Sequence, residues 1–383
     1  MTTTRTVLIA PDKFKGTLTA AQVVAALAAG IARTAPQLEV LSCPIADGGD
    51  GTVDAALAAG YEEHHAEVTG PTGEPWPARW AQQGETAVLE LAETVGLHAL
   101  PGGTLAPRTA STRGLGELIH AAIDAGARSL LVGLGGSSST DAGAGLLQGL
   151  GARLLDKSGA EIGPGLDGLA ALHTADLTPA LAAMDGIELV AANDVTNPLL
   201  GADGAAAVYG PQKGLSPEEI GPADEILAAA ASLLDPDAVH RDLTGAGAAG
   251  GAGFALSLLG AAQRSGADAV FALIGFSELL ARADAVVTGE GKLDSQTLQG
   301  KGPAEVARLA REKGVPVAAV AGAVTLEPDA LGAAGIGRAW DLITRAGSFE
   351  VAVAEGERLL TEIGEELGTW LVTAAEQSAQ PTA

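Results

Sequence analysis

The sequence predicts an α/β protein of two domains, in which a mixed domain is inserted into a domain built on a parallel sheet. Its 383 residues, at about 150 residues per domain, suit two to three domains. Short apolar runs recur, each followed by a cluster of Gly, Asp or Thr and then by a helical pattern, as in a parallel α/β sheet. A middle segment alternates apolar and polar residues, which indicates antiparallel strands of a second sheet.

The first two units of the parallel sheet lie near the N-terminus. A strand is expected at residues 6–10, which form an apolar run that ends at Pro11, and a helix is expected over residues 20–34. A second strand, at residues 38–43, leads through a glycine-rich turn to a helix over residues 52–59. Sheets of this kind bind their ligands beyond the carboxyl ends of the strands.

Later strands follow the same pattern. Residues 129–133 lead through a Gly/Ser loop to a helix that begins near residue 143. Residues 285–288 precede a charged loop and a helix that ends at residue 313, and a further strand follows at residues 317–321.

The inserted domain is predicted from a change of pattern. Residues 67–95 alternate and contain two turns, at 70–77 and 82–85, and a further strand is expected at residues 187–192. We expect residues 1–66 and 284–383 to form a discontinuous Rossmann- or flavodoxin-like domain, and residues 67–283 to form the inserted mixed α/β domain.

The composition limits the classes of partner. The chain has 22 Lys and Arg against 47 Asp and Glu, and this net charge of -25 repels nucleic acids and anionic membranes. Cys43 is the single cysteine, so no intrachain disulfide can form, which is typical of a reducing compartment. The N-terminal apolar run is too short for a signal peptide, and no apolar stretch reaches the roughly 18 residues of a membrane span. We therefore expect a cytoplasmic protein without nucleic-acid or membrane partners.

The loop at residues 133–145, rich in glycine and serine, is a candidate phosphate cradle. It follows a predicted strand and opens a helix, where glycine lets the backbone approach a ligand and helix N-terminal N–H groups attract anions. A tight turn with a Ser or Thr N-cap is the structural alternative, and the residues alone leave both open. The loop is not a dinucleotide fingerprint, because Ser138 occupies the place of the third glycine.

Other nucleotide and metal signatures are missing or out of context. Residues 245–250 match G-x-G-x-x-G but follow no predicted strand, which favours a packing or ligand loop over a Rossmann site. No P-loop motif occurs, and the six histidines lack zinc-binding spacing, so a P-loop kinase is excluded and a zinc enzyme is disfavoured.

Three charged loops follow predicted strands. Residues 12–15 (Asp-Lys-Phe-Lys), 47–50 (Asp-Gly-Gly-Asp) and 288–294 (Thr-Gly-Glu-Gly-Lys-Leu-Asp) combine carboxylates with lysine or flexible glycine. Each loop alone could be a solvated loop or an Asx turn. Because convergent charge destabilises a fold unless it is used, the three together favour a site at the sheet edge.

Further polar residues lie in loops. Residues 193–198 (Asn-Asp-Val-Thr-Asn-Pro) could form a structural turn or bind a hydroxyl or acid group, and Arg113 and Lys213 are flanked by glycine. Glycine-rich anion cradles, lysines and acidic pairs suit phosphoryl transfer, in which positioning and charge neutralisation supply most of the catalysis. The residues therefore favour a kinase that acts on a small molecule.

Eight segments, in order along the chain, carry a resemblance to a known family. They are residues 10–20, 45–52, 111–118, 135–145, 193–201, 210–214, 247–251 and 288–297. With them the chain resembles the bacterial glycerate kinase family, of the glycerate 2-kinase type, from about residue 6 to about residue 325. Lys13, Asp50, Thr140 and Asn193 stand where Ser, Glu, Asn and Cys are common in that family, and only the role of Thr140 is put in doubt.

The resemblance implies an activity and an architecture. It implies transfer of the γ-phosphoryl group of ATP to a hydroxyl of D-glycerate, with Mg²⁺, giving 2-phosphoglycerate. It also implies a discontinuous α/β domain with a mixed domain inserted, and an active site in the cleft between them. The expected assembly is a monomer or a homodimer.

Roles follow for the residues that match the family segments. Asp47 or Asp194 is expected to accept the proton of the glycerate hydroxyl, and Lys15 to neutralise developing charge during catalysis. Glu290 and Asp294 are expected to hold Mg²⁺. The other residues expected to bind glycerate or the nucleotide are Lys13, Gly48, Gly49, Arg113, Gly135, Gly136, Ser137, Ser138, Asn193, Thr196, Asn197, Lys213, Gly250, Gly251, Thr288 and Lys292.

Three alternatives stay open at this stage. The same reaction could give 3-phosphoglycerate. An NAD-dependent hydroxy-acid dehydrogenase would need a working dinucleotide fingerprint. A non-catalytic module would bind a hydroxy acid without releasing ADP.

Overall fold

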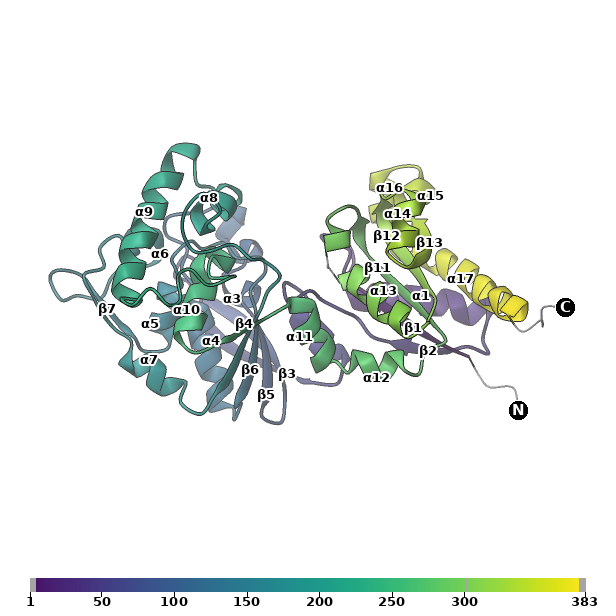
Figure 1. The fold of residues 1–383 in the computed structure, drawn as a ribbon, viewed down its shortest axis with the longest axis horizontal. Coiled ribbons are helices and arrows are strands. Elements are labelled where there is room, and N and C mark those ends of the chain that lie inside the picture. Colours follow the sequence, from purple (N-terminus) through teal and green to yellow (C-terminus); the bar gives the residue numbers. More distant parts are fainter. Residues whose placement is uncertain (1–4, 300–301, 379–383) are drawn as a thin grey trace. The chain divides into compact units, whose positions relative to one another are not determined.

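The structure, a computed structural model, describes residues 5–299 and 302–378. The chain folds into two compact units (Figure 1). The discontinuous unit consists of the chain up to Ala46 and from Val270 onward, and the inserted unit consists of Asp47–Ala269. Each unit contains its own major sheet, which confirms the predicted α/β class with an inserted mixed domain.

The unit boundaries differ from those predicted at 66/67 and 283/284. Helix α2 (Thr52–Ala58) packs against strands β4 (Pro75–Gln83) and β5 (Thr86–Glu90) of the inserted unit. Residue 66 lies inside strand β3 (Glu62–Thr69), which pairs with β4 along its whole length. Helix α12 (Phe276–Leu280) falls within the discontinuous unit.

The discontinuous unit is built on a five-stranded parallel sheet in the order β13-β12-β11-β1-β2. Its strands are β1 (Thr6–Pro11), β2 (Glu39–Ser42), β11 (Ala285–Leu293), β12 (Val317–Val324) and β13 (Ile336–Asp341). Strand β11 was expected to end at residue 288 but runs on to Leu293, because Lys292 and Leu293 pair with Ala323 and Val324 of β12. The strands β1 and β11 are neighbours, but β1 is followed by β2 toward one edge of the sheet and β11 by β12 toward the other edge.

Helix α1 (Ala20–Thr34) covers this sheet and ends at the predicted residues. Thr19 and Gln22 form a capping box at its N-terminus, and its apolar face is buried. Helix α17 (Gly356–Ser378) packs against it so closely that a Cβ on Gly30 would lie 2.0 Å from the Thr361 carbonyl oxygen. The other elements of the unit are η5 (Thr297–Gln299), α13 (Gly302–Glu312), α14 (Pro328–Ala333), α15 (Leu342–Ala346) and α16 (Phe349–Ala354).

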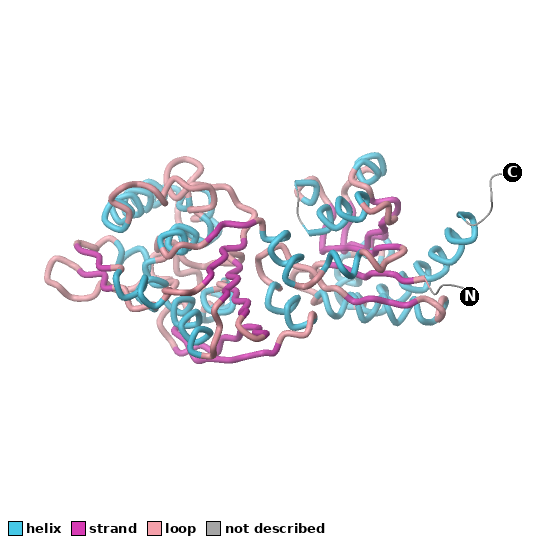
Figure 2. Tube along the Cα trace, turned by 60° about the horizontal axis from the view of Figure 1, so that its bottom comes forward, coloured by secondary structure: helices cyan, strands magenta, loops and turns pink. Residues whose placement is uncertain are grey.

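The inserted unit contains a six-stranded mixed sheet in the order β10-β9-β6-β5-β4-β3, whose strands are magenta in Figure 2. Strands β3, β4 and β5 are antiparallel, as predicted for residues 67–95. Strand β5 then runs parallel to β6 (Ser129–Gly133), β9 (Glu188–Ala192) and β10 (Ala262–Arg264). Four carboxyl ends therefore lie along one edge of this sheet.

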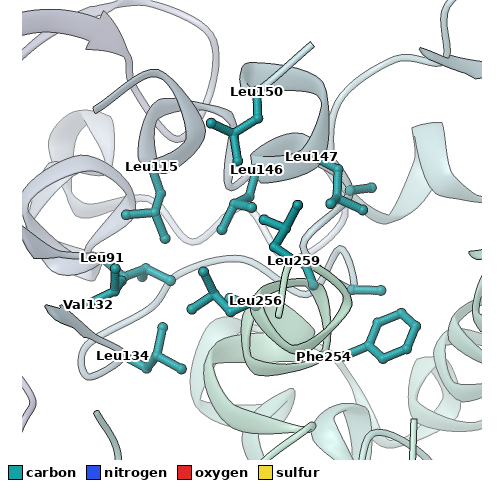
Figure 3. Close-up of a cluster of buried hydrophobic side chains, with 14 of the residues drawn as sticks. Leu91, Leu115, Val132, Leu134, Leu146, Leu147, Leu150, Phe254, Leu256 and Leu259 are labelled. Atoms are coloured by element: carbon teal, nitrogen blue, oxygen red, sulfur yellow. The ribbon is translucent and has the colours of Figure 1, made fainter. Parts of the chain in front are cut away.

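Leucine-rich helices form the core beside this sheet. Helices α4 (Arg113–Asp124), α5 (Ala144–Gly149) and α10 (Ala252–Leu258) bury side chains that include Leu115, Leu146 and Leu256 (Figure 3). The remaining elements are α3 (Ala92–Val95), η1 (Leu97–Ala99), η2 (Pro101–Gly103), β7 (Arg153–Leu155), α6 (Gly165–Leu169), β8 (Thr174–Asp176), α7 (Thr178–Ala183), α8 (Ala205–Tyr209), η3 (Pro211–Lys213), α9 (Pro217–Leu234) and η4 (Ala248–Gly251). Helix α11 (Gly266–Leu273) begins in the inserted unit and ends in the discontinuous unit. Within the described ranges, no helix combines the length and apolarity that crossing a bilayer requires.

Candidate active site

The loop that begins at Asp47 lies across the carboxyl ends of strands β6 and β9. The N–H of Leu134, just after β6, donates to the Gly48 carbonyl at 3.1 Å and to the Ala192 carbonyl at 3.2 Å. A Cβ on Gly48 would lie 2.5 Å from the Cα of Gly266, and one on Gly135 would lie 2.5 Å from the Cα of Gly49. Glycine is required at these positions because three chain segments meet there without room for side chains.

This packing brings together the two carboxylates that were predicted as alternative bases. Asp194 follows β9, and its Oδ1 accepts from the Ser265 hydroxyl at 3.0 Å and from the Gly266 N–H at 2.9 Å. Partial desolvation raises the pKa of Asp194, the two hydrogen bonds oppose this shift, and the charges of Asp47 and Asp268 add to it. Asp47 itself accepts the Gly49 N–H at 3.2 Å. The two predicted bases therefore belong to one acidic group, which also contains Asp268.

Glu90, which sequence reasoning missed, holds this loop in place. Its buried carboxylate accepts the N–H of Gly51, at 3.1 Å to each oxygen, and the N–H of Val53 at the start of helix α2. Burial raises the pKa of Glu90 to about 8, although these hydrogen bonds act in the opposite direction. The signal in the sequence is an acidic residue at the end of an apolar strand, whose partners lie far away in the chain.

Residues 135–143 of the candidate phosphate cradle pack against residues 247–251, which follow the start of the second glycine-rich loop. The Ala142 N–H donates to the Gly250 carbonyl at 3.0 Å, and a Cβ on Gly250 would lie 2.1 Å from the Ser139 carbonyl oxygen. Ala142 and Ala249 both have a φ of 53°, in the left-handed region that strains a non-glycine residue. Their close packing makes these two loops one rigid element.

The serines predicted to bind phosphate take part in this packing. The Ser137 hydroxyl lies 3.3 Å from the Ala249 carbonyl, and the Ser138 hydroxyl donates to the Val95 carbonyl at 2.8 Å. Gly251 is packed against Ala142, with a φ of 98° and no room for a Cβ. Gly136, in contrast, is exposed to solvent. Gly135 and Gly136 are thus the predicted cradle residues whose backbone reaches the surface of the loop.

Lys213 is buried beneath these two loops. Its side chain is 1% exposed and donates to the Ser139 carbonyl. Burial lowers the pKa of Lys213 to about 7, and the nearby Asp141 carboxylate opposes that shift. Asp141, also missed from the sequence, is fully buried and accepts four hydrogen bonds, from the N–H and hydroxyl of Thr112 and the N–H groups of Gly143 and Gly145. In this arrangement Lys213 binds a loop carbonyl, and its role in phosphate binding stays a prediction.

The remaining predicted residues of the inserted unit lie in the loop after β9 and at the start of α4. The Asn193 amide donates to Gln263 at 2.8 Å, and its carbonyl accepts the Val195 N–H at 3.2 Å. Asn197 accepts the Tyr209 hydroxyl at 2.6 Å, and Thr196 is exposed. Arg113 is exposed and pairs with Glu117 at 2.9 Å on the same helix.

In the discontinuous unit, the loop after β1 lies beside the last residues of strand β11. The Asp12 N–H donates to the Gly289 carbonyl at 2.8 Å, and a Cβ on Gly291 would lie 3.3 Å from the Lys15 backbone nitrogen. Lys15 and Lys292 are exposed, and Lys13 is half-buried. The predicted site residues after β1 and in the last part of β11 therefore share one sheet edge. Thr288, in contrast, is buried and donates to the Ala10 carbonyl at 2.9 Å.

Glu290 and Asp294, the predicted metal ligands, are joined through Thr297. The Thr297 hydroxyl donates to Glu290 at 2.6 Å and accepts the Asp294 N–H at 3.0 Å. The Asp294 carboxylate forms an ion pair with the Lys292 ammonium at 3.2 Å. The hydrogen bond from the Gln296 N–H is the largest cause that lowers the pKa of Asp294, and the hydrogen bond from Lys292 is the second. Among the described residues, no three or more His, Cys, Asp or Glu side chains are grouped so as to hold a metal ion. Glu290, Asp294 and Thr297 offer only oxygen donors, which suits Mg²⁺ brought in by a nucleotide because such an ion keeps water and phosphate ligands. Thr297 bonds the backbone N–H of Asp294, however, and not its carboxylate.

The predictions of an active site in a cleft between the two domains and of bound Mg²⁺ stay predictions.

Comparison with known proteins identifies the family. The model of the glycerate kinase family matches residues 7–372. The chain is 40% identical over 367 residues to the glycerate kinase of Bacillus subtilis (strain 168), covering 93% of this chain and 96% of that protein. It is 39% identical over 353 residues to the glycerate 2-kinase of Escherichia coli (strain K12), covering 90% and 92% of the two chains. The crystal structure of a candidate glycerate kinase 2 from Salmonella typhimurium LT2 is similar with a TM-score of 0.83, at 36% identity, covering 97% of this chain and 99% of that one. The chain therefore belongs to the glycerate kinase family.

Proposed function

We propose that this protein is an ATP-dependent kinase that transfers the γ-phosphoryl group to the 2-hydroxyl of D-glycerate and gives 2-phosphoglycerate. Membership of the glycerate kinase family and similarity to a glycerate 2-kinase support this proposal. The observation that carries it is the placement of Asp47 beside Asp194, where glycine-only packing lays one loop across the ends of two strands.

In the inserted unit, one of these carboxylates accepts the proton of the glycerate hydroxyl. A general base is most effective when its pKa is close to the working pH, and the raised pKa of Asp194 moves in that direction. Asp47 is held by the Gly49 N–H, on a loop that Glu90 fixes. Both remain candidates, and the exposed Gly136, next to the half-buried Gly135, supplies the backbone surface on which an anion binds.

In the discontinuous unit, Lys13, Lys15 and Lys292 neutralise the charge of the nucleotide phosphates. Glu290 and Asp294, joined through Thr297, hold the Mg²⁺ that accompanies ATP. When bound, this ion supplies neutralisation of the charge on the transferred phosphoryl group.

We also propose that the enzyme works in the cytoplasm, because a chain whose single cysteine is Cys43 forms no intrachain disulfide, as is typical of a reducing compartment.

The decisive experiment is phosphorus NMR of the product formed from D-glycerate, ATP and MgCl₂, with ADP release measured in parallel. We expect a new resonance at the position of authentic 2-phosphoglycerate and equimolar ADP. A resonance of 3-phosphoglycerate would retain the kinase and change the hydroxyl. Glycerate binding without ADP release would replace the kinase with a binding module, and NADH formation in the presence of NAD would indicate a dehydrogenase.

A further inference from the structure

A narrow apolar pocket lies in the discontinuous unit, beside the charged loops. Its walls include Phe14, Leu18, Leu342, Phe349 and Val353, and its volume is about 70 Å³. The Phe14 N–H donates to the Leu18 carbonyl at 2.8 Å, so a tight turn fixes the two side chains of one wall. The pocket therefore has a preformed wall and room for the edge of one planar ring.

The floor of the pocket carries no side chains. Gly291 of β11 and Gly322 of β12 line it, and their neighbours Glu290 and Lys292 pair with Ala321 and Ala323. A Cβ on Gly322 would lie 2.5 Å from the Gly291 carbonyl oxygen, so the close approach of the two strands excludes a larger residue. The two glycines leave backbone without side chains, which the edge of a planar ring can approach closely.

The topology places this pocket where parallel sheets bind ligands. The chain continues from β1 to β2 toward one edge of the sheet, and from β11 to β12 toward the opposite edge. A crevice forms at such a reversal of strand order, beyond the carboxyl ends, and is the usual ligand site of open α/β sheets. Phe14 and Lys15 follow β1 and Gly291 belongs to β11, so the pocket lies at that reversal.

The short helix α16 exposes apolar side chains at the rim. Phe349 is 60% exposed and Val353 is 40% exposed, and both line the pocket. Val351, on the same helix and 38% exposed, is not among the lining residues. Exposure of a large aromatic ring loses the free energy of burial unless a partner covers it.

We propose that this pocket binds the adenine base of ATP, with the ring edge over Gly291 and Gly322 and one ring face against Phe349; this inference rests on the proposed function. A purine presents flat apolar faces to such walls, whereas glycerate is a small anion with little apolar surface. Lys15 also lines the pocket, and the Glu290–Asp294 segment of β11 and its loop continues from its floor. The triphosphate therefore extends from the pocket toward the lysines and carboxylates already assigned to it.

The test measures nucleotide binding and turnover separately, in the full-length protein. Phe349→Ala and Val353→Ala are compared with Val351→Ala, which removes a similar exposed side chain outside the pocket. Loss of aromatic stacking is expected to raise the Kd of ADP, measured by calorimetry without glycerate, by roughly tenfold in Phe349→Ala. The KM for ATP should rise by a similar factor, while the KM for glycerate stays within about twofold. Val351→Ala should resemble the wild type.

Inorganic tripolyphosphate, which lacks a base, distinguishes base binding from phosphate binding. It should inhibit the wild type and Phe349→Ala equally. Unchanged ADP affinity in both pocket variants, with normal turnover in the wild type, would overturn this inference and leave the proposed function intact. ADP binding that weakens in Phe349→Ala, in a wild-type protein that phosphorylates no glycerate, would support the pocket and remove the proposed function.

Discussion

At the scale of single residues, the acidic group of the inserted unit separates two predicted roles. Desolvation is the main cause of the raised pKa of Asp194, and the charge of the Asp47 carboxylate adds to it, so the two carboxylates interact. One of them can act as the base while the other orients the hydroxyl, and substitution of each in turn identifies which.

Asp47→Asn and Asp194→Asn are both expected to fold normally, because asparagine keeps the size of the side chain. Loss of the general base is expected to lower kcat by about 10²–10⁴-fold, and loss of the second carboxylate by less. Coupled ADP release with D-glycerate measures this, and Asp185→Asn, an exposed carboxylate at a turn, is the control. Near-normal turnover of one variant removes that residue from the list of bases.

Lys213 gives a second prediction, about stability and pH. Its pKa is lowered from 10.5 to about 7 in the folded protein, so below pH 7 both the folded and unfolded chains carry its proton. Between pH 7 and 10.5 the unfolded chain binds the proton more strongly, so the contribution of this group to stability rises with pH. The wild type should therefore gain on the order of 2 kcal/mol over Lys213→Met between pH 6.5 and 9.5.

Urea unfolding at the two pH values checks this sign. Lys157→Met, which replaces an exposed lysine of the same unit, should show no such pH-dependent difference from the wild type. Parallel stability profiles of the wild type and Lys213→Met would mean that the buried amine keeps its ordinary pKa.

At the scale of elements, the sequence predicted correctly the bounds of those elements that depend only on their own residues. Helix α1 ends at the predicted residues because its capping box and apolar face lie within its own sequence. The extension of β11 to Leu293 was missed because it depends on pairing with β12. The predicted boundary at residue 66 was displaced because α2 packs on strands that come later in the chain.

The residues of the candidate site also fall into those that local sequence reveals and those that it does not. Residues 47–50 and 290–294 were found because glycine and charge after an apolar run are visible in the sequence, although residues 290–293 belong to β11 and not to a loop. Glu90, Asp141 and the burial of Lys213 were not, because each depends on hydrogen bonds between distant segments.

The close packing of the Asp47 loop gives an element-scale prediction. Gly48 has a φ of 79° and Gly186 a φ of 72°, but only at Gly48 would an added Cβ meet other atoms, 2.5 Å from the Cα of Gly266. Both Gly→Ala variants carry the cost of a left-handed alanine, about 1–2 kcal/mol. Gly48→Ala should lose a further 1 kcal/mol or more, roughly, because backbone must move, and it should also lose turnover.

Chemical unfolding and ADP release of the two variants separate these effects. Gly186→Ala, at an open turn, should keep wild-type kcat. Equal stability losses in the two variants would show that the loop moves aside at no cost, and that the contact between Gly48 and Gly266 does not hold Asp47 in place.

At the scale of the whole molecule, the net charge of -25 opposes the anionic substrates of the proposed reaction. The field of the whole protein acts over the Debye length, which is about 30 Å at 0.01 M salt and about 8 Å at 0.15 M. Attraction by lysines such as Lys15 acts over a few ångströms and is screened less. Added salt therefore weakens the long-range repulsion more than the local attraction.

The kcat/KM for ATP, measured with glycerate saturating and free Mg²⁺ constant, should consequently rise by roughly two- to fivefold as KCl increases from about 10 to 150 mM. Most anion-binding enzymes with basic surfaces show the opposite dependence, because salt screens their attraction for the substrate. A fall in kcat/KM over this range would mean that the local lysines, and not the acidic molecule around them, determine the association of the nucleotide. The Lys15→Met variant tests that reading, because removal of local attraction should steepen the rise with salt.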